Sequence, residues 1–195
     1  TVFPIWTSTP GVNGFEPGAG DILMLPDPET FRILPWSPHT AWIFCNPRFK
    51  SGETISFSPR DLLKSAIEKL AEQGLELIVG LEIEFHIFER VDPMLEHAHA
   101  TMPGQAVKTR NLTHGYQFLT DTHYDAVEPI MDELRRNCIA MNLPVRSMEI
   151  EMGPSQFEFT FGPADPLTHA DNVIMFRTMV KEVCARQGLH ATFMC

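Results

Sequence analysis

The stretch that decides the fold is Gly-Leu-Glu-Ile-Glu-Phe-His-Ile-Phe at residues 80–88. Side chains alternate between the two faces of a β-strand, so Glu82, Glu84 and His86 share one face and the apolar residues share the other. Carboxylates two residues apart on one face lie about 7 Å apart, because a strand rises roughly 3.3 Å per residue. The stretch therefore predicts a strand with one apolar face and one acidic face. Alternation alone favours a half-buried strand whose charged face is solvated.

A second acidic stretch follows at residues 148–159, Met-Glu-Ile-Glu-Met-Gly-Pro-Ser-Gln-Phe-Glu-Phe. With a turn at 153–154, these residues form a hairpin over 145–161 whose apolar side chains all share one face. The polar face then collects Glu149, Glu151, Gln156 and Glu158. In this register Glu149 lies opposite Glu158 and Glu151 opposite Gln156, and like charges opposite each other destabilise a sheet. Solvation relieves that cost, and so do hard cations with oxygen ligands. The two stretches predict a metal–phosphate site, with a solvated acidic sheet as the alternative.

The rest of the 195 residues indicates an α+β protein of two parts. A β-rich beginning predicts short strands at 21–25, 31–34 and 41–45, with Pro-containing turns between them. Helices are expected between Ser58 and Gly74, at 124–141 and at 168–188. A strand is expected from Leu75 to Phe88, and the segment 91–115 is expected to be a loop. Helices and strands that alternate after a β-rich start are typical of the α+β class.

Composition narrows the function classes. The net charge of −10 argues against a nucleic-acid partner, because phosphate binding needs clustered Lys and Arg. No apolar run approaches the roughly 20 residues that span a bilayer, and no signal peptide is recognisable, so we expect a cytoplasmic protein. The cysteines are too far apart for a zinc or disulfide framework: Cys45, Cys138, Cys184 and Cys195. Because the chain lacks an initiator Met and ends on an apolar run, we expect a fragment of a longer protein.

Several motifs occur in a fixed order along the chain. They are Gly-x-Glu-x-Glu-Phe at 80–85, Glu-x-x-Pro-x-Gln-x-Glu at 151–158 and Gly-Leu-His-Ala-Thr-Phe-Met at 188–194. This ordered set resembles the glutamine synthetase family. Pro-Asp-Pro-x-Thr at 26–30 and Leu-Pro-Trp at 34–36 resemble the N-terminal β-grasp domain of that family.

The resemblance implies a fold and an activity. It implies a β-grasp-like domain at 1–57, followed at 58–195 by the first part of a catalytic α+β domain, an antiparallel sheet flanked by helices. The implied enzyme is an ATP-dependent ligase that phosphorylates the γ-carboxylate of glutamate, after which ammonia displaces the phosphate. It implies Mg²⁺ or Mn²⁺ as cofactor and ATP as co-substrate. It also implies a homo-oligomeric ring with active sites between adjacent subunits.

The resemblance also assigns site residues by position. The catalytic and metal-binding residues carried over are Glu82, Glu84, Glu151 and Glu158. Glu82 would help to hold the ion at the ATP phosphates, and the other three would hold the ion on the glutamate side. Gln156 and Tyr116 would contribute to substrate binding, Gln156 as a neighbour of the ligands and Tyr116 as part of the pocket wall.

Some positions depart from the family pattern. Ser155 stands where the family usually has Gly, and Glu149-Ile150 stands where many members have His-His. The family's Asp-Gly-Ser-Ser type ammonium loop is not recognisable in residues 1–20. Two alternatives therefore stay open: a ligase for an amine such as putrescine, and a non-catalytic homologue or fragment with a structural role. The family's remaining metal ligands lie beyond a Phe-Met like the one at 193–194.

Overall fold

The computed structural model describes residues 2–5, 18–92, 96–100 and 103–194. Backbone contacts divide the chain into two compact units. One unit comprises Thr1–Ile78 with Asp165–Ala170, and the other comprises Val79–Ala164 with Asp171–Cys195. The division at residue 57 that the resemblance implies stays a prediction. Among the described residues, no helix combines the length and the apolar character needed to cross a membrane.

The first unit is built from short antiparallel strand pairs. Its strands are β1 (Val2–Ile5), β2 (Gly18–Asp21), β3 (Leu23–Pro26), β4 (Arg32–Leu34), β5 (Ser37–Trp42) and β6 (Cys45–Arg48). They pair as β1–β2, β3–β6 and β4–β5, and a 3₁₀ turn, Pro28–Thr30, lies between β3 and β4. Where one strand was expected at 41–45, β5 and β6 are found. β5 begins before its Pro38, which is tolerated because a two-stranded pair has no central strand whose donors must all be used.

Helix α1 (Pro59–Glu72) follows these strands in the same unit. It begins after Ser58, whose backbone is extended, and has Pro59 at the first helical position, as the sequence predicts. A bidentate pair joins the helix to β6, with Arg48 donating to Asp61 at 2.7 and 2.9 Å. The neighbouring Arg60 donates to Asp27 at 2.8 Å. These ion pairs fix α1 on the strands of its own unit.

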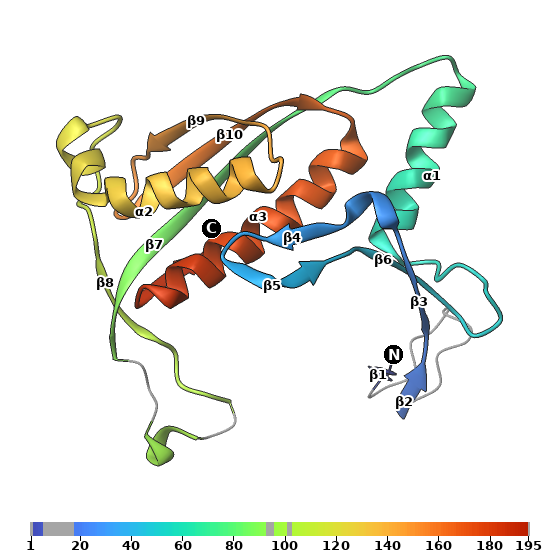
Figure 1. Ribbon diagram of the computed structural model, residues 1–195, viewed down its shortest axis with the longest axis horizontal. Helices are drawn as coiled ribbons and strands as arrows, with labels where there is room; N and C mark the ends of the chain where they lie inside the picture. Colours follow the sequence, from blue (N-terminus) through green and yellow to red (C-terminus); the bar gives the residue numbers. More distant parts are fainter. Residues whose placement is uncertain (1, 6–17, 93–95, 101–102, 195) are drawn as a thin grey trace. The chain divides into compact units, whose positions relative to one another are not determined.

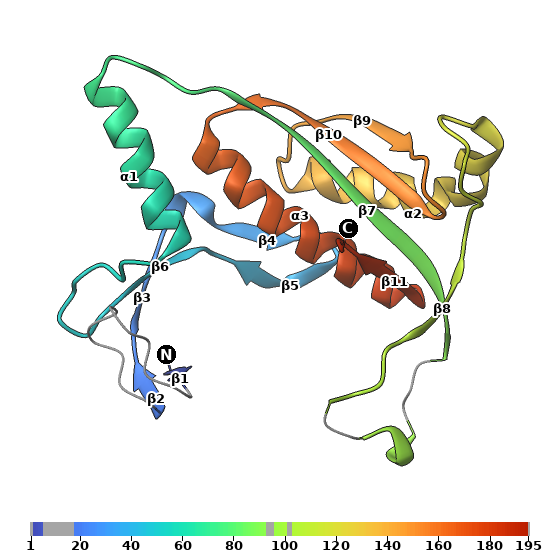
Figure 2. The same ribbon diagram turned by 180° about the vertical axis from the view of Figure 1, so that it is seen from behind.

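The second unit contains an antiparallel sheet (Figures 1 and 2). Its strands are β7 (Val79–Asp92), β8 (Lys108–Asn111), β9 (Val145–Ile150), β10 (Gln156–Ala164) and β11 (Leu189–Thr192). The order is β11-β7-β10-β9, and β8 pairs with the far end of β7. The strand expected from Leu75 begins later, at Val79. Within the segment expected to be a loop, β8 is a strand whose side chains are all exposed, so no alternation marked it in the sequence.

Two long helices cover the apolar face of this sheet: α2 (Asp121–Ala140) and α3 (Pro166–Arg186) (Figures 1 and 2). The centre of the core is aromatic. Phe176 on α3 lies 5.5 Å from Phe85 on β7 and 5.2 Å from Phe159 on β10, measured between ring centroids. Pro129 lies inside α2 rather than at its boundary, and the helix begins at Asp121, earlier than expected. The expected α+β class, with an antiparallel sheet flanked by helices, is confirmed.

Candidate metal centre

The antiparallel register brings the predicted glutamates onto one face of the sheet. β10 pairs with β7 so that Glu158 lies opposite Glu84, and it pairs with β9 so that Glu158 also lies opposite Glu149. The predicted hairpin register is confirmed, since Phe157 pairs with Ile150 on the opposite, apolar face. Three carboxylates thus form one row across the sheet, with Glu158 in the middle.

The rows on either side complete this polar face. Above the central row, His86 pairs with Gln156, whose carbonyl accepts a hydrogen bond from the Glu151 N–H at 3.0 Å. Below it, Glu82 pairs with Thr160, which pairs in turn with Ser147. Each row runs from β7 through β10 to β9. The first row is His86, Gln156 and Glu151, and the central row is Glu84, Glu158 and Glu149. The third row is Glu82, Thr160 and Ser147. All four predicted metal-binding glutamates therefore lie on this face: Glu84 and Glu158 share the central row, and Glu151 and Glu82 lie in the rows on either side.

Within this face, one group of carboxylates is close enough to share an ion. Oxygen atoms of Glu149, Glu151 and Glu158 lie within 4.8 Å of one another. An oxygen-only donor set of this kind suits hard divalent cations such as Mg²⁺ and Mn²⁺. Of the residues that the resemblance assigns to a metal, Glu151 and Glu158 belong to this group, and together with Glu149 they fit such an ion chemically.

The electrostatics of the cluster point the same way. Glu158 is 9% exposed. Burial, a hydrogen bond with Glu151 and the charges of Glu151, Glu149 and Glu82 raise the pKa of Glu158 to about 7. A carboxyl group in this position prefers to be neutral unless a positive charge is supplied. A bound cation would supply that charge.

Glu149 is the member of the cluster that the sequence interpretation did not assign to the metal. Alternation along 148–151 placed it on the polar face, but the family pattern offered no carboxylate at that position. Its carboxylate accepts a hydrogen bond of 2.8 Å from the Ser147 hydroxyl, which orients it within the face. Glu84, by contrast, accepts a hydrogen bond from the side-chain amide of Gln156. The structure therefore brings Glu151 and Glu158 together with Glu149, while Glu84 is held beside them by Gln156.

Tyr116 lies next to the turn of the hairpin. Its backbone N–H donates to the Met152 carbonyl at 2.7 Å, and its φ of 62° is in the left-handed region. Its side chain is 94% exposed. It is therefore close in the fold to Glu151 but is not enclosed by the described part of the chain.

Comparison with known proteins identifies the family. Residues 56–195 match the family described as glutamine synthetase, catalytic domain. The chain belongs to the glutamine synthetase family. It is 36% identical to the γ-glutamylanilide synthase of an Acinetobacter species, over 95% of this chain and 38% of that protein. It is 30% identical to the glutamate–isopropylamine ligase of a Pseudomonas species, over 93% of this chain and 38% of that protein.

Members named for ammonia chemistry are also similar. The glutamine synthetase of Halobacterium salinarum is 31% identical, over 89% of this chain and 37% of that protein. Among solved structures, ligand-free GmaS superposes with a TM-score of 0.76 at 28% identity, over 93% of this chain and 40% of that one. Plasmodium falciparum glutamine synthetase gives 0.73 at 20% identity, over 100% and 41%, and so supports the fold alone. The chain spans about 38% of the length of these synthetase relatives.

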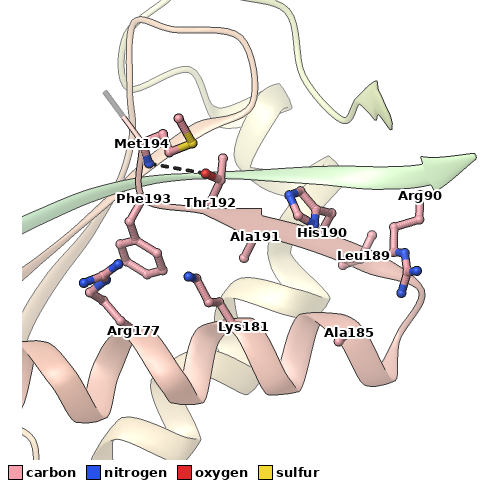
Figure 3. Close-up of a pocket in the computed structure, with 10 residues that line it drawn as sticks. All are labelled: Arg90, Arg177, Lys181, Ala185, Leu189, His190, Ala191, Thr192, Phe193 and Met194. Atoms are coloured by element: carbon pink, nitrogen blue, oxygen red, sulfur yellow. Dashed lines mark hydrogen bonds between the residues drawn. The ribbon is translucent and has the colours of Figure 1, made fainter. Parts of the chain in front are cut away.

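A cavity of about 390 Å³ lies elsewhere on the second unit, between α3 and β11 (Figure 3). Arg177 and Lys181 reach from α3 toward the ring of Phe193, with their charged groups 5.4 and 5.9 Å from its centroid. Arg90 and His190 line its other end. None of the glutamates of the polar face lines this cavity, so it is separate from the candidate metal centre.

Proposed function

We propose that the protein containing this chain is an ATP-dependent ligase that joins the γ-carboxyl group of glutamate to an amine. The observation that carries the proposal is the carboxylate face of the sheet, where Glu149, Glu151 and Glu158 converge within 4.8 Å in a glutamine synthetase family chain. A cluster of this density on a half-buried sheet face is unfavourable without cations. Its presence is what a metal-dependent phosphoryl-transfer enzyme requires.

The residues divide between two ion positions. Glu84, Glu151 and Glu158 would hold the ion on the glutamate side, with Glu149 as an additional neighbour, and Glu82 would help to hold the ion at the ATP phosphates. Bound Mg²⁺ or Mn²⁺ neutralises the charge that develops during phosphoryl transfer. Gln156 keeps Glu84 oriented through its amide and contributes to the glutamate pocket.

The reaction proceeds in two balanced displacements. A γ-carboxylate oxygen of glutamate attacks the γ-phosphorus of ATP, and ADP leaves, giving γ-glutamyl phosphate. The amine nitrogen then attacks the acyl carbon, phosphate leaves with the bonding electrons, and the nitrogen loses a proton. The negative face formed by Glu151, Glu158 and Glu149 would attract a protonated amine. That amine would lose one proton to water to become the neutral nucleophile, and the nitrogen would lose a second proton to water after the attack.

For the acceptor, we propose a primary amine larger than ammonia. Relatives that are 30–36% identical are named γ-glutamylanilide synthase, glutamate–isopropylamine ligase and γ-glutamylethanolamide synthetase. In the structure, Tyr116 is joined by a backbone hydrogen bond to Met152, the residue after Glu151, and the side chains of Tyr116 and Met152 are 94% and 59% exposed. Exposed side chains of this kind would suit the apolar part of such an amine. Ammonia is the second candidate, because glutamine synthetases are 29–32% identical to this chain.

The test uses the full-length protein with glutamate, ATP and Mg²⁺ or Mn²⁺. Ammonia, aniline, isopropylamine, ethanolamine and putrescine are offered separately, and the γ-glutamyl product is detected by mass spectrometry together with ADP release. We expect amide formation that depends on the metal and is faster with a substituted amine. Faster turnover of ammonia would favour the second candidate. Absence of any product, with no divalent metal bound to the folded protein, would favour a non-catalytic role.

We further propose a homo-oligomeric ring with active sites between adjacent subunits, in which 1–57 is the β-grasp-like domain and 58–195 begins the catalytic domain. Membership of the family supports this arrangement. Light scattering on the full-length protein measures the mass of the assembly. A stable monomer would contradict the proposal.

A further inference from the structure

Ser155 occupies an unusual position in the hairpin turn. Its φ is 56°, in the left-handed region that side chains other than glycine rarely adopt, and it is 0% exposed. The turn is closed by a hydrogen bond of 3.2 Å from the Gln156 N–H to the Gly153 carbonyl. A left-handed residue just before Gln156 accounts for the glycine usual at this position in the family. Its replacement by a buried serine needs a compensating interaction.

The compensation is a reciprocal set of hydrogen bonds with the segment 112–113. The Ser155 hydroxyl accepts from the backbone N–H groups of Leu112 and Thr113 at 2.7 and 3.2 Å. In return, the Ser155 N–H donates to the Thr113 hydroxyl at 3.1 Å. The Ser155 carbonyl accepts from the Ile87 N–H on β7 at 3.1 Å. Ser155 is thus held by two separate segments, and a glycine would leave two backbone donors without the acceptor that they use here.

The segment that follows Thr113 runs alongside the turn. The Tyr116 N–H donates to the Met152 carbonyl at 2.7 Å, and the Leu119 N–H donates to the Ile150 carbonyl at 3.1 Å. Directly before Tyr116, a Cβ atom on Gly115 would lie 2.9 Å from Pro154, so only glycine allows this approach. The contact between segment 112–119 and the turn is therefore close and extends from Ile150 to Ser155.

The hairpin turn also determines the positions of side chains in the candidate metal centre. The Gln156 side chain accepts from the Gly153 N–H at 2.7 Å through one end of its amide and donates to Glu84 through the other. The Glu151 N–H donates to the Gln156 carbonyl at 3.0 Å. Any displacement of the turn would move Glu151 and release Glu84.

We propose that Ser155 is a positioning residue for the metal centre. Its hydroxyl binds the turn to segment 112–113 and thereby fixes Glu151, Gln156 and Glu84. The inference rests on the metal site of the proposed function. Partners that orient metal ligands without touching the metal commonly change affinity by about 10- to 100-fold when they are removed.

The experiment measures Mn²⁺ affinity of the full-length protein by isothermal titration calorimetry, beside its melting temperature. Ser155→Ala removes the hydroxyl and keeps the unfavourable φ, whereas Ser155→Gly removes both the hydroxyl and the steric penalty. We expect both variants to lose about tenfold or more in Mn²⁺ affinity. We expect Ser155→Gly to melt at a higher temperature than Ser155→Ala, because glycine adopts this φ without strain.

We therefore expect the two Ser155 variants to differ in melting temperature but to lose Mn²⁺ affinity alike. If Ser155 contributed only to stability, Mn²⁺ affinity would follow the melting temperature.

Thr113, the hydrogen-bond partner of Ser155, offers a second pair of variants. Thr113→Val removes the Thr113 hydroxyl, and Thr113→Ser retains it. The first should weaken Mn²⁺ binding and the second should preserve it. Thr30→Val is the control, because it removes a hydroxyl that makes hydrogen bonds of 2.7 and 2.8 Å inside the first unit. It should lower the melting temperature and leave Mn²⁺ affinity unchanged.

A second readout uses no metal. Hydrogen–deuterium exchange of the metal-free Ser155→Gly variant should be faster than in the wild type at Leu112, Thr113, Tyr116 and Leu119. Wild-type Mn²⁺ affinity in both Ser155 variants, or affinity that follows melting temperature across the whole set, would overturn the proposal. A wild-type protein that binds no Mn²⁺ would overturn it as well. Failure to form an amide while Mn²⁺ still binds would count only against the proposed function.

Discussion

Glu158 on β10 stands directly opposite Glu84 on β7 in the antiparallel register. On its other side it stands opposite Glu149, so a carboxyl group that is 9% exposed has a carboxyl neighbour on each adjacent strand. Like charges in such positions destabilise a sheet. Without a bound metal ion, the polar face therefore destabilises the folded protein. Glu158, which causes this destabilisation, is also a residue that would bind the cation.

Glu158→Gln should stabilise the metal-free protein and weaken its binding of metal ions. At pH 8 it removes a buried charge, so we expect the metal-free full-length protein to become more stable by about 1–2 kcal/mol. It also removes a ligand, so Mn²⁺ affinity should fall by at least about tenfold. Urea unfolding in EDTA and Mn²⁺ titration measure the two quantities. Glu72→Gln, at an exposed position on α1, should change neither. A destabilised variant with unchanged affinity would contradict this account.

Stability of the metal-free protein should depend on pH in a defined direction. Burial and neighbouring carboxylates raise the pKa of Glu158 from 4.5 to about 7. Below pH 4.5 the Glu158 carboxyl is protonated in both the folded and the unfolded protein. Between pH 4.5 and 7 it loses its proton in the unfolded chain but keeps it in the folded protein. The contribution of Glu158 therefore falls as pH rises through this window and levels off above 7.

The measurement is urea unfolding in EDTA at pH 5, 6, 7 and 8. Burial lowers the pKa of His86, which acts in the opposite direction, so the difference between wild type and Glu158→Gln isolates the carboxyl. That difference should grow from pH 5 to pH 7. A difference that is constant over this range would show that Glu158 keeps an ordinary pKa.

The sequence was sufficient for the hairpin because its apolar pattern allows one register. A shift by one residue would have moved Phe157 and Phe159 to the polar face, and both are 0% exposed. The sequence could not predict that Glu149 converges with Glu151 and Glu158. Alternation determines the face on which a side chain lies but not its rotamer. The contact between Ser155 and Thr113 spans more than forty positions in sequence and leaves no periodic signal. Strand β8 was missed for a related reason, since it forms only by pairing with β7.

The apolar face depends on Phe85, which lies on β7 between Glu84 and His86. It is 1% exposed, and its ring lies 5.5 Å from Phe176 and 5.4 Å from Phe193 between centroids. Phe85→Ala should reduce the free energy of unfolding by about 3–5 kcal/mol, through lost burial and the cavity left behind. Urea unfolding of the full-length protein measures this. Phe118→Ala is the control, because Phe118 is 53% exposed and should change stability by less than about 0.5 kcal/mol.

The first unit offers a separate test in the pair Arg48–Asp61, which joins β6 to α1. The two side chains are 18% and 12% exposed and meet through hydrogen bonds of 2.7 and 2.9 Å. The hydrogen bond from Arg48 lowers the pKa of Asp61 in the folded protein. The stabilisation from this pair is therefore complete above the pKa of the unfolded chain, near 3.9, and is lost as pH falls through the lower pKa of the folded protein.

Asp61→Asn should reduce the free energy of unfolding by about 1.5–3 kcal/mol at pH 7, the range for hydrogen bonds to charged groups. Asp21→Asn should have a much smaller effect, because Asp21 and its partner Lys50 are 53% and 69% exposed and water screens their attraction. Chemical unfolding at pH 7 and pH 3 checks both. The Asp61→Asn effect should shrink at pH 3, and an equal effect at both values would mean that the charge of Asp61 does not stabilise the helix.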